Sequence, residues 1–213
     1  MKRTLIVQGG WEGHEPKAIA DVLAKALKEN GFQVEIFDTL DAFKDQEKLE
    51  KLDLIVPIWT MGTIEADQLN PMLAAVRKGT GIAGVHGGMG DAFRCETEYQ
   101  YMVGGQWVAH PGGDGITYEV NITDVPSPIT EGMSDFTVTS EYYYMHVDPG
   151  NTVLATTRFG EVLMPVVWTK MYGKGRVFYC SLGHSASVAK QPEVLTMVTR
   201  GMIWAAEGKA LAS

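Results

Sequence analysis

The sequence has few of the groups that would place the protein in a specialised class. It contains two cysteines among 213 residues, Cys95 and Cys180, and they form no CxxC pair, so neither a disulfide framework nor a cysteine zinc motif is expected. No apolar run approaches the roughly 18 residues that a membrane-spanning helix needs. The segment MKRTLIVQGG is also too poor in apolar residues for a secretory signal. These absences predict a cytoplasmic protein that does not engage a membrane.

Positive charge is also scarce. The chain has 18 Lys and Arg residues against 26 Asp and Glu residues, and its net charge is −8 with no basic block. Because phosphate contacts need clustered cations, nucleic acid is not an expected partner. Hydrophobic residues make up 45% of the chain, as in an ordinary globular protein. Length and composition together predict one domain over residues 1–213.

Strand-like and helix-like segments alternate through the first half of the chain. Apolar runs predict strands at 3–8, 32–37, 53–59 and 81–86, and periodic segments predict helices at 17–30, 44–52 and 65–78. Three of the runs are apolar throughout, as in parallel strands that are covered on both faces. The pattern predicts an α/β fold of the flavodoxin-like type, a three-layer sandwich around a mostly parallel central sheet.

The second half of the chain has a different pattern. Strand-like segments follow one another without long helices at 116–122, 135–146, 152–158 and 162–168. We expect these to be antiparallel additions to the parallel core. The buried run at 175–183 predicts one more strand of the central sheet, and the segment 192–206 predicts the last helix.

All five histidines fall at predicted strand ends or in loops. In open α/β sheets, ligands bind outside the carboxyl ends of the strands, so we expect at least two imidazoles to share one cleft. Imidazoles that converge with a carboxylate can bind zinc or another divalent metal, although no HxxH or CxxC spacing occurs here. The candidate metal ligands are His14, His110 and His146, together with His184.

Three of the five tryptophans are predicted to lie in loops near this cleft. An indole offers a flat apolar face and a polar N–H, which suits a sugar ring, but each of these side chains could equally fold back onto the core. The segment GGWEGHE lacks the lysine of a P-loop and the spacing of GxGxxG, so no nucleotide cofactor is expected. The expected ligand is a small carbohydrate. The candidate substrate-binding residues are Trp11, Glu12, Trp59, Gly87, Trp107 and Tyr142.

Five segments in order resemble the trehalose-utilisation (ThuA-like) family of the class I glutamine amidotransferase-like superfamily: GGWEGHE, GIAGVHGG, GGQWVAHP, PITEGMSDFTVTSEYYY and GKGRVFYCSLGH. The resemblance spans nearly the whole chain and implies a flavodoxin-like core and a role in carbohydrate metabolism. True amidotransferases have a cysteine at the strand-to-helix elbow, which a histidine after a late strand activates. His184 resembles that histidine, but His86 stands at or beside the cysteine position. A Cys-dependent amidotransferase is therefore not expected.

The resemblance further implies an enzyme that acts on a disaccharide or a keto-sugar such as a 3-keto glycoside, as an isomerase, lyase or hydrolase. Removing the acidic proton beside a keto group needs a base and a donor or metal that stabilises the enediolate. His86, His184 and Glu141 are the candidate catalytic residues. A non-catalytic carbohydrate-binding or regulatory protein on the same scaffold is the main alternative. A hydrolase with Ser181 as nucleophile is disfavoured because Ser181 falls within a strand, and self-association as a homo-oligomer is left open.

Overall fold

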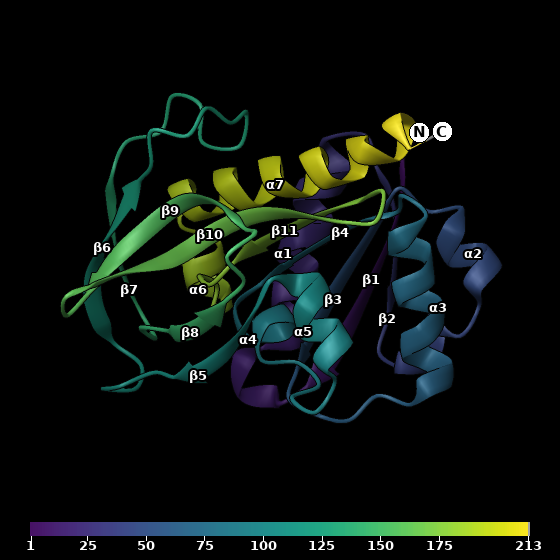
Figure 1. Ribbon diagram of the computed structural model, residues 1–213, viewed down its shortest axis with the longest axis horizontal. Helices are drawn as coiled ribbons and strands as arrows, with labels where there is room; N and C mark the ends of the chain where they lie inside the picture. Colours follow the sequence, from purple (N-terminus) through teal and green to yellow (C-terminus); the bar gives the residue numbers. More distant parts are fainter. Residues whose placement is uncertain (213) are drawn as a thin grey trace.

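A nine-stranded sheet runs through the centre of the molecule (Figure 1). The computed structural model describes residues 1–212. Five strands are parallel neighbours in the order β2 (Gln33–Phe37), β1 (Arg3–Gly10), β3 (Leu54–Thr60), β4 (Gly81–Val85) and β11 (Gly175–Cys180). Four antiparallel strands continue the sheet as β10 (Val162–Tyr172), β9 (Thr152–Phe159), β6 (Ile116–Ile122) and β7 (Phe136–Ser140). The predicted parallel core and its antiparallel extension are confirmed.

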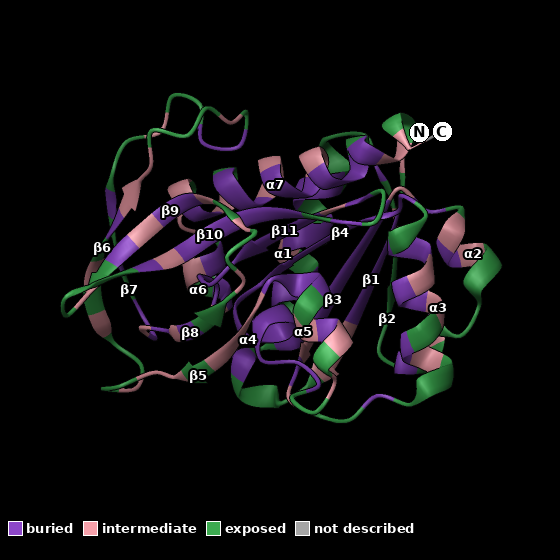
Figure 2. Cartoon of the chain, in the orientation of Figure 1, coloured by how far each residue is buried: buried purple, intermediate pink, exposed green. Residues whose placement is uncertain are grey.

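Helices cover both faces of this sheet. The longer helices of one face are α1 (Pro16–Glu29) and α7 (Pro192–Leu211), with the short α6 (Ala186–Ala189) beside them. The other face carries α2 (Gln46–Glu50), α3 (Ala66–Arg77) and α5 (Thr97–Val103). Three short helices come soon after strands: η1 (Glu12–His14), η2 (Leu40–Phe43) and α4 (His86–Gly90). The central strands are buried and the outer helix surfaces are exposed (Figure 2), which gives the predicted three-layer sandwich.

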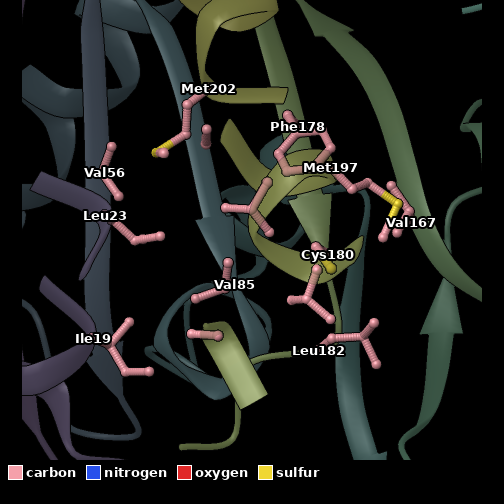
Figure 3. Close-up of a cluster of buried hydrophobic side chains, with 14 of the residues drawn as sticks. Ile19, Leu23, Val56, Val85, Val167, Phe178, Cys180, Leu182, Met197 and Met202 are labelled. Atoms are coloured by element: carbon pink, nitrogen blue, oxygen red, sulfur yellow. The ribbon is translucent and has the colours of Figure 1, made fainter. Parts of the chain in front are cut away.

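Alternation along the strands explains the two cores. Successive side chains of a strand point to opposite faces, so Leu5 and Val7 join one core while Ile6 joins the other. Figure 3 shows part of the core that contains Ile6, where Leu23 of α1 and Met202 of α7 pack around Val85 and neighbouring strand residues. Strands buried on both faces read as continuous apolar runs, which is why the sequence predicted them well. No helix of the described residues is long and apolar enough to cross a bilayer.

The predicted strand at 135–146 is wrong, because the chain changes sheets within it. Its first part, β7, ends at Ser140 and pairs with β6. Its last part is β8 (Tyr144–Val147), which pairs with β5 (Gly105–Ala109) in a separate two-stranded sheet. Residues 141–143 form the crossing between the sheets. The strand predicted at 175–183 also ends earlier, at Cys180, and β5 and α5 were not predicted.

A partly buried ion pair fastens the small sheet to the large one. Lys170 of β10 donates to Asp148, just after β8, at 2.5 Å and to the backbone carbonyl of Tyr101 in α5 at 2.5 Å. The lysine side chain is only 7% exposed, so its charge has little access to water. Three elements are thereby held together by one cation.

The packing of α7 on the sheet predicts that alanine substitutions at two glycines of that helix have different effects on stability. A methyl group at Gly201 would lie 2.4 Å from the buried ring of Phe178, whereas one at Gly208 would meet only the flexible side chain of Arg176. Both alanine substitutions gain the same helix propensity, so it cancels in the comparison. We expect Gly201→Ala to be about 1–3 kcal/mol less stable than Gly208→Ala in urea unfolding. Equal stabilities would show that the α7–sheet contact is looser than described.

The Lys170–Asp148 pair predicts a pH-dependent loss of stability. Removing Asp148 leaves the charge of Lys170, which is 7% exposed, without its ionic partner, so Asp148→Asn should cost about 1–2 kcal/mol at pH 7 in this partly solvated pair. The hydrogen bond from Lys170 lowers the pKa of Asp148. The ion pair therefore contributes its full amount to the free energy of unfolding above about pH 3.9, the pKa of an aspartate in the unfolded chain. This contribution is lost as the pH falls through the lower pKa of Asp148 in the folded protein.

Urea unfolding of both proteins from pH 7 to pH 3 measures this difference. The difference in free energy of unfolding between the wild type and Asp148→Asn should become smaller only below about pH 4. The exposed Asp124, substituted to Asn, is the matched control and should change stability by less than about 0.5 kcal/mol. A gap that stays constant down to pH 3 would contradict the ionic origin of the effect.

Candidate functional site

Three histidines and one glutamate converge near the carboxyl ends of the parallel strands. One ligand atom from each of His14, His86, Glu141 and His184 lies within 4.8 Å of every other. They come from four separate places: η1 after β1, the β4–α4 turn, the crossing between β7 and β8, and the loop after β11. We call these four residues the His/Glu cluster. Such an edge is where open α/β sheets bind their ligands.

The Glu141 carboxylate is the centre of the cluster. Its Oε2 lies 3.0 Å from His86 Nε2, 3.4 Å from His184 Nδ1 and 3.6 Å from His14 Nε2. His184 Nδ1 and His86 Nε2 are 3.3 Å apart. The glutamate is 5% exposed, so its charge is almost completely removed from solvent.

A tight strand-to-helix turn places His86. The strand β4 ends at Val85, and His86 begins α4 with a φ of 48°, a left-handed conformation that is strained for a residue with a side chain. The next residue must be small, since a Cβ at Gly87 would lie 2.6 Å from the His14 ring. Gly87, predicted to bind substrate, is buried and makes room for His14. Sequence reasoning expected the elbow and placed His86 on it.

Each imidazole of the cluster turns its second nitrogen toward an outer oxygen. His86 Nδ1 lies 2.8 Å from the carbonyl of Ser181, and His14 Nδ1 lies 2.8 Å from the hydroxyl of Thr60. His184 Nε2 faces the Asp114 carboxylate at 3.7 Å. This arrangement, with one nitrogen inward and the other held by an oxygen, is typical of histidines that ligate a metal.

The protonation of His86 follows from these contacts. A carbonyl oxygen only accepts hydrogen bonds, so His86 Nδ1 carries the proton and donates it to Ser181. Burial lowers the pKa of His86 to about 4, so the ring is neutral near pH 7 and Nε2 keeps its lone pair. That lone pair faces the Glu141 carboxylate.

The carboxylate is ionised. Burial opposes the charge of Glu141, but hydrogen bonds with His14 and His184 outweigh it and hold the pKa below its usual range. The same carboxylate raises the pKa of His184. Two acceptors, His86 Nε2 and Glu141 Oε2, therefore lie 3.0 Å apart, and a cation would relieve their repulsion.

The donor set fits a divalent metal. Tetrahedral bonds of 2.0–2.1 Å to zinc give ligand-to-ligand distances of about 3.3 Å. The three distances from Glu141 Oε2 and the distance between His86 and His184 range from 3.0 to 3.6 Å and scatter around this value, and all the ligand atoms lie within 4.8 Å of one another. Three imidazoles and one carboxylate are also ordinary zinc ligands, and zinc can expand to a fifth ligand.

The other two histidines lie in different places. His110 Nδ1 is 3.8 Å from Glu141 Oε1, and this buried nitrogen has no hydrogen-bond partner among the described residues. His110 thus lies beside the cluster. His146, predicted as a ligand, does not join it: it is exposed on β8, while the preceding Met145 is 2% exposed and points inward. The alternation of the strand separates the two.

A cleft of about 830 Å³ adjoins the cluster at Trp11 and Thr60. The Trp11 ring packs edge-on against His14 at 4.7 Å between ring centroids, and nearly half of Trp11, 48%, is exposed. The predicted sugar-binding residues Trp11, Glu12 and Trp59 all line this cleft, with Asp38 and Lys17 beside them.

Glycines seat the two indoles of the cleft. A Cβ at Gly9 would lie 2.5 Å from the Trp59 ring, and one at Gly62 would lie 2.8 Å from its Nε1. A Cβ at Gly13 would lie 2.4 Å from the Trp11 ring. The glycines of GGWEG therefore give the indoles room.

The remaining predicted substrate-binding residues lie outside this cleft. Trp107 packs near His110 at 5.4 Å between centroids, and its Nε1 is buried without a partner among the described residues. Tyr142 stacks on Phe159, and its hydroxyl donates to the Arg158 carbonyl. Its neighbour Tyr143 instead stacks on His86, with centroids 4.1 Å apart. Sequence reasoning missed Tyr143 because it expected one continuous strand where the chain changes sheets between β7 and β8.

Neither cysteine belongs to the cluster. Cys180 is buried in β11, and burial raises the pKa of its thiol to about 12. Cys95 is exposed, after the elbow helix. Ser181 contributes its backbone carbonyl to His86. The residues at the elbow are thus imidazole and glycine, with no thiol among them.

Solved structures share this fold. A ThuA-like protein from Parabacteroides merdae superposes with a TM-score of 0.80 at 20% identity, over 98% of this chain and 91% of its own. A ThuA-like protein from Bacteroides uniformis gives 0.80 at 16% identity, over 96% and 91%. A β-galactosidase from Bacillus circulans sp. alkalophilus gives 0.63 at 12% identity, over 96% of this chain but 30% of its own. At these identities the likeness concerns the fold alone.

Sequence comparison gives the family. No curated protein matches the chain. The family model described as trehalose utilisation matches residues 3–205, which is nearly the whole chain and includes every residue of the His/Glu cluster. The chain belongs to the ThuA (trehalose utilisation) family.

Proposed function

We propose that this protein is an enzyme of sugar metabolism whose catalytic centre is the His/Glu cluster, loaded with a divalent metal such as zinc. The observation that carries the proposal is the 3.0 Å contact between His86 Nε2 and Glu141 Oε2, two buried acceptors in need of a cation. The outer partners of two imidazoles support it: the Ser181 carbonyl holds the His86 ring with a lone pair facing inward, and the Thr60 hydroxyl holds the His14 ring. The family description supports a sugar as the substrate.

The proposed substrate is a disaccharide or a keto-sugar such as a 3-keto glycoside. A metal at the cluster would polarise a carbonyl or hydroxyl oxygen of the sugar as a Lewis acid. The C–H bonds beside a keto group are acidic, so a base next to that oxygen can remove a proton. His110, whose unpartnered Nδ1 lies 3.8 Å from Glu141 Oε1 beside the cluster, is the group among the described residues suited to hold that proton.

The cleft beside the cluster is the proposed place for the rest of the sugar. Indole faces pack well on the apolar side of a pyranose ring, and carboxylates such as Glu12 and Asp38 accept hydrogen bonds from its hydroxyls. Thr60 lines the cleft and also bonds His14, so a sugar in the cleft lies next to the cluster. The acidic lining disfavours an anionic ligand such as a phosphate.

A non-catalytic sugar-binding or regulatory protein is the competing proposal. The exposed indole of Trp11 favours it, since a cleft with aromatic and neutral donors is enough to bind a sugar. A binder has no need of three imidazoles buried around a carboxylate, whose desolvation costs free energy. The cluster therefore favours the enzyme, and turnover of a keto-sugar separates the two.

The metal proposal predicts that substitutions of two histidines differ in their effect on zinc affinity and on turnover. Untagged protein should bind about one equivalent of zinc, and His184→Ala should weaken that binding at least about 100-fold, since it removes a ligand rather than an outer partner. The same variant should lower turnover of a 3-keto glycoside by about 10²–10⁴. Chelator competition and rate measurements test this. His146→Ala, the exposed histidine, is the control and should leave both values unchanged. Equal zinc affinity for both variants would rule out the proposed centre.

The cleft proposal predicts a loss of sugar affinity without a loss of metal. Trp59→Ala should weaken the binding of trehalose or its 3-keto derivative about tenfold, or about 1.4 kcal/mol, because it removes one stacking surface. Trp59→Phe should keep part of the affinity, and zinc binding should stay as in the wild type. Calorimetric titration measures both. Trp204→Phe, on α7, is the control. Unchanged sugar affinity in Trp59→Ala would place the sugar elsewhere.

A further inference from the structure

The loop between β5 and β6 reaches the outer side of the cluster at two points. It spans residues 110–115, with the sequence HPGGDG. His110 at its start faces Glu141 Oε1 at 3.8 Å, and Asp114 near its end faces His184 Nε2 at 3.7 Å. Both separations exceed the usual 2.7–3.2 Å of an N–H···O hydrogen bond, so the loop stands slightly back from both groups.

His184 is the least constrained ligand of the cluster. His14 and His86 have their outer nitrogens 2.8 Å from buried oxygens, which belong to Thr60 and Ser181. His184 lacks such a bond, and its side chain is 13% exposed against 8% and 2% for the other two. To be held as firmly as His14 and His86, the His184 ring needs an acceptor for its outer nitrogen, Nε2. Asp114 is the carboxylate that faces this nitrogen.

The geometry of Asp114 suits this task. Its Oδ1 accepts a hydrogen bond from the Gly115 amide at 2.7 Å, which orients the 64% exposed carboxylate so that Oδ2 faces His184. The loop can move by the small distance required. Gly113 and Gly115 have φ values of +67° and +86°, and no atom would lie within 4 Å of an added Cβ at either. A shift of about 0.5–1 Å would bring Oδ2 into hydrogen-bond range.

We propose that Asp114 is a positioning residue, which accepts a hydrogen bond from His184 Nε2 and so presents Nδ1 to the metal, and that loop 110–115 closes onto the ring when the metal binds. The inference rests on the proposed metal centre and adds a coupling to it. By linkage, the loop and the metal stabilise each other: ordering the loop raises metal affinity, and the metal orders the loop.

Zinc affinity in four variants tests the proposal. Chelator competition with zinc should give Asp114→Asn a dissociation constant about 10–100-fold weaker than that of the wild type, the usual cost of losing an outer partner. Asp114→Glu should recover part of this loss because it keeps the carboxylate. Asp124 is an exposed aspartate in the connection between β6 and β7, and the Asp124→Asn variant should bind zinc as the wild type does. His184→Ala reports on the centre itself and should be weakened more than Asp114→Asn.

Nitrogen NMR of His184 gives a readout that a merely structural role would not change. In the zinc-loaded wild type, Nε2 should carry the proton and Nδ1 should be the metal-bound nitrogen, whereas Asp114→Asn should weaken or mix this tautomer. Amide exchange of residues 112–115 should slow on zinc addition in the wild type and less so in Asp114→Asn.

Three results are decisive. Weaker zinc binding by Asp114→Asn together with the altered tautomer supports the proposal. Wild-type affinity and tautomer in Asp114→Asn, with weakened binding in His184→Ala, overturns the role of Asp114 and leaves the metal centre standing. Zinc affinity that is absent from the wild type, or unaffected in His184→Ala, overturns both.

Discussion

The contact between His86 and Glu141 is the constraint on which the rest of the site depends. It joins the parallel half of the sheet to the antiparallel half, because His86 directly follows β4 and Glu141 lies between β7 and β8. The glutamate reaches the histidines only because the chain leaves one sheet and enters another at that point. Its charge is nearly removed from water, so the surrounding imidazoles must compensate it. The crossing is therefore both a feature of topology and the source of the electrostatics of the site.

Much of the parallel half could be predicted from the sequence, since strands buried on both faces are continuous apolar runs with helices between them. The positions of His14, His86 and His184 at strand ends followed from the same pattern. The convergence of these three with Glu141 depends on strand order, which local sequence does not encode. The break at Glu141 was missed because β7 and β8 pair with β6 and β5, and alternation alone does not reveal which partner each segment has. His146 was misplaced for the same reason, since its face is decided by the register of β8.

The glycine-rich segments show how one sequence pattern can serve different physical needs. A run such as GGWEG after a first strand suggests a phosphate-binding turn, yet here its glycines leave space for the indoles of Trp11 and Trp59. Gly87 leaves space for the His14 ring, and the glycines of 110–115 allow left-handed turns over the cluster. Only the surrounding side chains distinguish these uses. Glycine content therefore indicates where close approach occurs, and the neighbouring structure decides what approaches.

The elbow explains why this site presents an imidazole at the end of β4. A strained residue at a strand-to-helix turn projects its side chain to one fixed place, whatever that side chain is. With a thiol there, the turn would present a nucleophile. With His86 there, the Ser181 carbonyl takes one ring nitrogen and the other faces a carboxylate, which makes the ring a neutral donor of electrons toward a cation. The nearby Cys180 cannot substitute, because burial keeps its thiol protonated. For the proposed metal centre, a histidine at this turn needs a carboxylate opposite it, and the crossing between β7 and β8 supplies Glu141.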